Sequence, residues 1–213
     1  MIFLALITLV LACDSSTKYG IPSDEEATFE TSMLYTNLKE LSKTKVLYGH
    51  QDDLAYGYSW WEESGRSDVK ESTGSYPAVY GWELGNISQG VPTNLDGVDF
   101  EKMKGWIKEA YSRGGINTIS WHMNNPVTGG DSWDNTRAVY AILPGGDKHS
   151  LYVSWLDIFA DFIGDLKGEN GEAIPIIYRP FHEHTGSWFW WGDEQTTTDE
   201  YVELWRFTQQ YLT

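Results

Sequence analysis

Ionisable and aromatic side chains gather in one short segment, residues 174–192, which reads IPIIYRPFHEHTGSWFWWG. After an apolar run, the segment places a cation, an imidazole and a carboxylate within five residues, at Arg179, His182 and Glu183. Three indole rings follow, at Trp188, Trp190 and Trp191. A sugar ring has apolar C–H faces and hydroxyl edges, so flat aromatic surfaces beside carboxylates are typical of a carbohydrate site. Each of these residues alone is more often structural, and the prediction of a site depends on the cluster.

Four apolar runs predict the strands that would carry such a site. Ile174–Tyr178, interrupted only by Pro175, has the pattern of a strand buried on both faces of a parallel sheet. Similar runs precede it, at residues 46–51, 77–84 and 116–123. The first run leads into a loop rich in Tyr and Trp, and the third into a polar, Gly-rich loop.

Apolar residues at helical spacing predict helices between and around these strands. We expect them from Thr28 to about Lys43, from an N-cap at Asp99 to Gly114, over 151–166, and from an N-cap at Asp199 to Leu212. The alternation predicts an α/β fold of the (β/α)8 TIM barrel type, with the cluster at the C-terminal mouth.

The chain is acidic, with a net charge of −16. Binding to nucleic acid needs clustered Lys and Arg, so this charge excludes a nucleic-acid partner. The 11 Trp and 13 Tyr residues exceed what one core of this size requires, which favours an aromatic surface for stacking.

Several segments resemble glycoside hydrolase family 26, the β-mannanases. RPFHE at 179–183 followed by GSWFWWG at 186–192 resembles the family's acid/base segment. YGHQ at 48–51 resembles the opening of the family's domain, and SWH at 120–122 with NPVTGG at 125–130 resembles a further segment. The likeness extends from about Tyr48 to the last residue.

This resemblance implies a mannan endo-1,4-β-mannosidase that acts on β-mannan or a related plant polysaccharide by a retaining mechanism. Glu183, kept protonated by the aromatic side chains around it, would be the proton donor. His122 would contact the sugar next to the scissile bond, and His182 with Arg179 would orient carboxylates and substrate. Trp188 and Trp191 would stack on sugars, with Trp133 as a weaker stacking candidate.

Two further residues are predicted to support the site. Glu83 ends the second strand and could be catalytic on general grounds, but the family places its catalytic pair on strands four and seven. His50 either faces the site or is a hydrogen-bonded structural histidine.

Other functions stay open. A lipid-anchored carbohydrate-binding protein without catalysis would need the same tryptophans, and family 26 also includes enzymes acting on xylan and lichenan. No cofactor is expected. A metal site at His182, Glu183 and His184 is disfavoured, because on a strand Glu183 would point away from the two histidines.

Only four βα units are predicted, so residues 28–213 are expected to be the N-terminal part of a longer barrel domain, unless four units close by dimerisation. The last strand would then have an exposed edge. No position matches the family's nucleophile segment, and the nucleophile is expected beyond Thr213.

The N-terminus has the pattern of a targeting signal. Residues 2–12, IFLALITLVLA, are too short to span a bilayer but suit a signal peptide, although no Lys or Arg precedes them. Val10–Cys13 resembles a bacterial lipobox, and Cys13 is the only cysteine. We expect a signal over 1–13, a flexible linker over 14–27 and a secreted or cell-envelope lipoprotein of a bacterium, with membrane contact only through this anchor.

Overall fold

The computed structural model describes residues 22–213. The predicted signal segment with Cys13, and the first part of the predicted linker, lie outside the described residues. Among residues 22–213, no helix combines the length and the apolar character needed to cross a bilayer.

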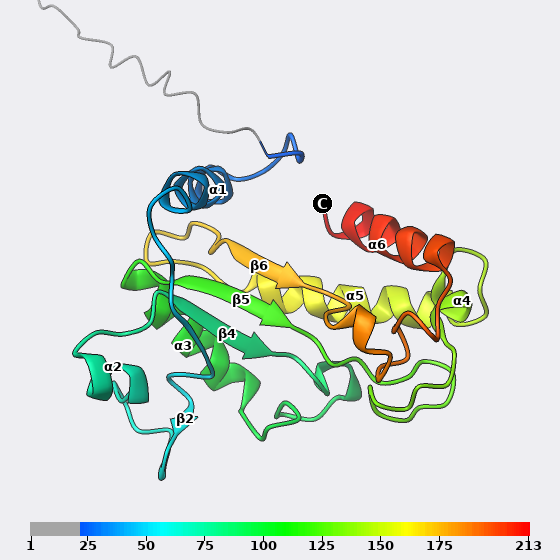
Figure 1. The fold of residues 1–213 in the computed structure, drawn as a ribbon, viewed down its shortest axis with the longest axis horizontal. Helices are drawn as coiled ribbons and strands as arrows, with labels where there is room; N and C mark the ends of the chain where they lie inside the picture. The colour runs from blue at the N-terminus through cyan, green and yellow to red at the C-terminus, as the bar shows by residue number, and fades with distance from the viewer. Residues whose placement is uncertain (1–21) are drawn as a thin grey trace, which may run out of the picture.

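A parallel sheet forms the centre of the fold (Figure 1), with the strand order β1-β4-β5-β6. Its strands are β1 (Gly49–Gln51), β4 (Val79–Glu83), β5 (Ile116–Ser120) and β6 (Ile176–Arg179). A short antiparallel hairpin of β2 (Tyr56–Gly57) and β3 (Trp60–Trp61) follows β1. The four predicted strands and their parallel, α/β arrangement are confirmed.

Helices alternate with these strands. They are α1 (Phe29–Leu41), α2 (Asp68–Thr73), α3 (Phe100–Ser112), α4 (Val139–Ile142), α5 (His149–Gly164) and α6 (Thr198–Leu212), with 3-10 turns η1 (Ile87–Gln89) and η2 (His184–Gly186). Thr28 and Asp99 cap α1 and α3. The predicted cap of the last helix at Asp199 is wrong. Thr197 is the cap, because its side chain accepts from the Glu200 N–H while the Glu200 carboxylate accepts from the Thr197 N–H.

One face of the sheet packs against α3 and α5. Trp82 donates its indole N–H to Asn117 Oδ1 at 2.8 Å, and the Asn117 amide donates to the carbonyl of Ile107 in α3 at 3.2 Å. Trp121 lies on the same face as Asn117, four residues further along the chain. Its ring stacks on Phe159 of α5, with ring centroids 6.0 Å apart. Trp82 and Asn117 thus pair their polar groups inside an otherwise apolar layer, whereas the Trp121 indole N–H is buried without a hydrogen-bond partner within residues 22–213.

The predicted full burial of the fourth strand is wrong. Ile176, Ile177 and Tyr178 are only partly buried and Arg179 is exposed. Within the described sheet β6 pairs with β5 alone, so its outer edge has no neighbouring strand to cover it.

Candidate active site at the carboxyl ends of the strands

The chain turns sharply after β6. Within this turn the Phe181 side chain is buried and the Glu183 side chain is exposed. Phe181 and Glu183 both adopt left-handed backbone conformations, with φ of 50° and 56°. Such values are strained for residues other than glycine and must be held by surrounding packing. The Phe181 ring is buried near Trp205 of α6, and the Tyr201 hydroxyl donates to the Phe181 carbonyl at 3.1 Å. Helix α6 thereby fixes the turn that carries the candidate acid/base residue.

Glu183 lies on the exposed rim of the site. Its Oε2 accepts a hydrogen bond from the Trp188 indole N–H at 2.9 Å, and the Trp188 ring is 48% exposed. The structure therefore differs from the expectation that aromatic rings surround this carboxyl group. The left-handed turn directs Glu183 outward, whereas Trp190 and Trp191 point into the core.

Two histidines from different strands meet beside this turn. His122, which follows β5, and His182, which follows β6, have their Nε2 atoms 3.1 Å apart, and their rings form an edge-to-face pair. Because a neutral imidazole donates from only one nitrogen, one Nε2 must donate and the other accept. Burial, and next the neighbouring His122, lower the pKa of His182, which favours its neutral form.

Glu83 determines which nitrogen of His122 carries a proton. Its Oε2 lies 2.9 Å from His122 Nδ1, an arrangement that favours a hydrogen on Nδ1. With Nδ1 protonated, the neutral His122 ring accepts at Nε2 from the Nε2–H of His182. His182 Nδ1 is then the unprotonated nitrogen, and it is buried without a hydrogen-bond partner within residues 22–213.

The Glu83 carboxylate is almost fully buried and accepts several hydrogen bonds. Its Oε1 accepts from the Gly85 and His122 backbone N–H groups at 2.7 Å each, and Oε2 accepts from the Ser120 hydroxyl at 2.6 Å. Burial by itself would raise the pKa of Glu83, but the interactions of its carboxylate with His122 and with the Ser120 hydroxyl outweigh it and hold the pKa low. A carboxylate so completely engaged positions His122 and has no free lone pair for a substrate.

The predicted stacking residues separate into exposed and buried rings. Trp133 is 53% exposed and its ring stacks parallel to His122, with centroids 5.1 Å apart. Trp191 is fully buried, stacks on Phe189, and donates its indole N–H to the His182 carbonyl at 2.9 Å. Trp191 therefore has no open face for a sugar, in contrast to the expectation, and instead supports the backbone of His182.

The remaining predicted residues lie further from this centre. Arg179 is exposed and, within the described part of the chain, its side chain makes no hydrogen bond or ion pair, although its charge contributes to the lowered pKa of His182. His50 Nδ1 lies 3.3 Å from buried Asp53, and His50 lines a cavity of about 270 Å³ together with residues of α2. His50 Nδ1 makes no hydrogen bond within residues 22–213, so neither alternative for His50 is confirmed.

Sequence reasoning missed a second group of acidic residues. Asp52 is fully buried at the end of β1, and burial, together with the charges of Asp96 and Glu83, raises its pKa to about 7 despite a hydrogen bond from Gln51. Burial and the charge of Glu83 also raise the pKa of Asp96. The Asp52–Asp53 pair directly after the first predicted strand was the available signal.

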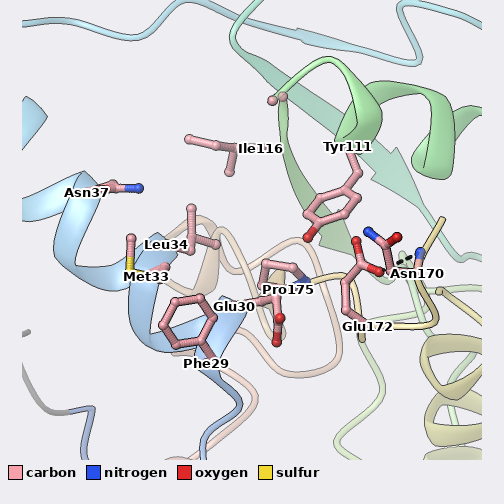
Figure 2. A pocket seen from close by; sticks show the side chains of 12 residues that line it. Phe29, Glu30, Met33, Leu34, Asn37, Tyr111, Ile116, Asn170, Glu172 and Pro175 are labelled. Carbon is pink, nitrogen blue, oxygen red and sulfur yellow. Dashed lines mark hydrogen bonds between the residues drawn. The ribbon is translucent and has the colours of Figure 1, made fainter. Parts of the chain in front are cut away.

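A cavity of about 440 Å³ lies at the opposite end of the strands (Figure 2). Phe29 and Leu34 of α1 line one side of it, and Tyr111, Ile116 and Pro175 line the other. Because Ile116 begins β5 and Pro175 directly precedes β6, this cavity is separated from Glu183 by the length of the sheet. It contains none of the predicted site residues. Over residues 22–213, no group of three or more His, Cys, Asp or Glu side chains is arranged to hold a metal ion.

A carboxylate, a histidine pair and exposed indoles at the carboxyl ends of parallel strands define the class of α/β proteins whose active site lies at the strand ends. Residues 23–213 match the family model described as Glycosyl hydrolase family 26, and the chain belongs to that family. The resemblance carried by residues 179–192 is thus confirmed.

Relatives with known names support this membership. The chain is 38% identical over 194 residues to a mannan endo-1,4-beta-mannosidase of Bifidobacterium adolescentis, covering 89% of this chain and 19% of that protein. The GH26 beta-mannanase BoMan26A of Bacteroides ovatus superposes with a TM-score of 0.85 at 46% identity, over 87% of this chain and 55% of that one. A modular endo-beta-1,4-mannanase of Cellulomonas fimi gives a TM-score of 0.79 at 38% identity, over 87% and 43%. The chain thus spans between about a fifth and about half the length of these relatives.

Proposed function

We propose that this chain is part of an endo-β-1,4-mannanase that cleaves β-1,4-mannosidic linkages with retention of configuration. The observation that carries the proposal is the exposed Glu183 carboxylate, which Trp188 holds beside the His122–His182 pair. Membership of family 26 and relatives named as mannan endo-1,4-beta-mannosidases support the reaction class and the substrate.

Glu183 would act first as an acid and then as a base. In the first step its carboxyl proton passes to the glycosidic oxygen as the bond from that oxygen to the anomeric carbon breaks. In the second step the carboxylate takes a proton from the water that attacks the anomeric carbon of the glycosyl-enzyme intermediate. Because Oε2 already accepts from Trp188, Oε1 is the oxygen available to carry the transferred proton.

Retention also needs a nucleophilic carboxylate, roughly 5 to 5.5 Å from the acid/base group. Glu83 is a poor candidate, because its two oxygens accept from Gly85, Ser120 and His122 and their lone pairs are occupied. We assign the nucleophile to the part of the family domain that residues 22–213 do not span.

The histidine pair would recognise the sugar next to the scissile bond. His122 is held by Glu83 from below and by Trp133 on one face, so its orientation is fixed before substrate arrives. Mannose differs from glucose in its axial 2-hydroxyl, and His122 is the group that we propose distinguishes them. A xylan or lichenan chain is the alternative substrate within this family. We place the protein outside the cytoplasm, as a secreted or envelope-anchored enzyme, on the basis of the apolar run at 2–12 and Cys13.

The test is Glu183→Ala in a protein that contains the whole family domain, with the nucleophile, and Glu194→Ala is the matched control, an exposed glutamate without a role in the site. The proton matters only when the departing oxygen is basic, so hydrolysis of mannan should fall by ~10²- to 10⁴-fold. Cleavage of an aryl oligomannoside with a good leaving group should show a normal first step and slow turnover. Full activity of Glu183→Ala on mannan would overturn the assignment.

A further inference from the structure

The β2–β3 hairpin presents an exposed aromatic surface outside the proposed reaction centre. The Tyr56 and Trp61 rings stack in parallel, with centroids 5.1 Å apart and an interplanar angle of 9°. Trp61 is nevertheless 47% exposed, and Tyr58 at the tip of the hairpin is 87% exposed. With Tyr56 covering one face of Trp61, the exposure of Trp61 falls on its other face and edge.

The hairpin is held rigidly from below. Asp68, at the start of α2, accepts from the Tyr58 backbone N–H at 2.6 Å and from the indole N–H of buried Trp60 at 2.5 Å. Glu62, which follows Trp61 with a left-handed φ of 54°, forms an ion pair with Lys102 of α3. A ring fixed in this way loses little conformational entropy when it binds a ligand.

The hairpin lies at the same end of the sheet as the reaction centre. It follows β1, which runs parallel to β4, β5 and β6, so both it and the turn at Glu183 extend from carboxyl ends of strands. In Figure 1, β2 lies below β4, on the side of the sheet away from β6, and the edge strand on that side is β1. A surface on the hairpin would therefore bind a part of the ligand remote from Glu183.

The β4–α3 loop connects the two regions. The outer edge of the Trp61 ring lies beside Gly97, so that a Cβ added at Gly97 would come into van der Waals contact with the ring at 3.7 Å. The neighbouring Asp96 lies near enough to Glu83 and His122 for both charges to affect its pKa. The carboxyl end of the sheet thus carries a row of neighbouring groups. The row begins at Trp61, continues through Gly97 and Asp96, and ends at Glu83 and His122.

We propose that Trp61, backed by Tyr56, binds a pyranose ring of the polysaccharide at a remote subsite, by stacking on the C–H face of the sugar. An exposed, flat and preorganised indole suits a neutral ring, and the net charge of −16 on the chain disfavours an anionic ligand. This inference rests on the proposed function, because it assumes that the bound chain is the one that Glu183 cleaves.

The test compares oligosaccharides of increasing length. Binding of β-1,4-manno-oligosaccharides is measured by calorimetry on the full chain, using the Glu183→Ala background to prevent turnover. Affinity should rise when the oligosaccharide becomes long enough to reach the hairpin. Trp61→Ala should lower the affinity for the long oligosaccharides about tenfold and leave the affinity for the shortest binding oligosaccharides unchanged. Trp61→Phe should keep part of the gain, and Tyr35→Ala on α1, an exposed aromatic before β1, should keep all of it.

The outcomes separate the two proposals. A length-dependent gain that survives in Trp61→Ala would overturn the remote subsite and leave the proposed function intact. An equal loss for short and long oligosaccharides, together with a lowered melting temperature, would make Trp61 structural and also overturn it. If the parent protein binds no manno-oligosaccharide of any length, the proposed function itself is overturned.

Discussion

The floor and the rim of the site contain the same residue types in opposite environments. The floor, defined by Glu83, Ser120 and Trp191, is buried, and the rim, defined by Glu183, Trp188 and Trp133, is exposed. Glu83 accepts hydrogen bonds at both oxygens, whereas the only hydrogen bond to the Glu183 carboxylate within residues 22–213 comes from Trp188. A glutamate at a strand end can thus be a fixed support or a reactive group, and its surroundings decide which.

The two tryptophans should give the largest contrast. Trp191→Ala removes a fully buried ring and the indole N–H that donates to the His182 carbonyl, and should lower the free energy of unfolding by about 3 to 5 kcal/mol. Trp188→Ala should change it by less than about 1 kcal/mol while weakening oligosaccharide binding. Urea unfolding of both variants measures the difference. Equal destabilisation would show that the rim ring is also part of the core.

Substitution of buried Glu83 should also lower stability more than substitution of exposed Glu183, but by a smaller margin than for the two tryptophans. Glu83→Gln keeps the shape of the side chain but puts an amide N–H₂ among donors from Gly85, Ser120 and His122, at a cost of about 1 to 3 kcal/mol of stability. Glu183→Gln should be close to neutral in stability and should lose hydrolysis of mannan. If Glu83→Gln keeps wild-type stability, the proposed positioning of His122 by a charged acceptor is contradicted.

The stability that the Glu83 carboxylate contributes should depend on pH. The folded pKa of Glu83 is held below the ordinary glutamate value of about 4.3, so the stability that its charge provides is fully present above that pH. It is lost as the pH falls through the lower folded pKa. The stability difference between wild type and Glu83→Gln should therefore shrink as the pH is lowered below about 4. If the stability difference between wild type and Glu83→Gln stays constant over this range, the charge of Glu83 does not contribute to stability.

The sequence predicted the positions of the strands and helices better than it predicted their burial and their caps. Alternating apolar runs and helical periodicity located all four parallel strands, because these patterns follow from the geometry of each element by itself. Burial of β6 could not be predicted in this way, since it depends on whether another strand covers the outer edge. The cap at Thr197 was obscured by Asp199, which suits a cap equally well by residue type.

The candidate site shows the same limit. The segment 179–192 identified the acid/base candidate and its family from residue order alone. It could not show that Trp188 is exposed and Trp191 buried, because three left-handed residues, Phe181, Glu183 and Ser187, redirect the chain before it reaches these tryptophans. Such conformations are unfavourable locally and must be held by packing, as Tyr201 and Trp205 of α6 hold Phe181.

The sequence by itself determined that this is an acidic α/β protein of family 26 with Glu183 at the end of a strand, since composition, periodicity and motif are properties of residue order. Only the tertiary structure decided that Glu83 supports His122, that His122 meets His182, and that Trp61 is left open on the hairpin. These relations join residues far apart in the chain. They arise when β4, β5 and β6 pair in parallel and bring their carboxyl ends together, which no local pattern specifies.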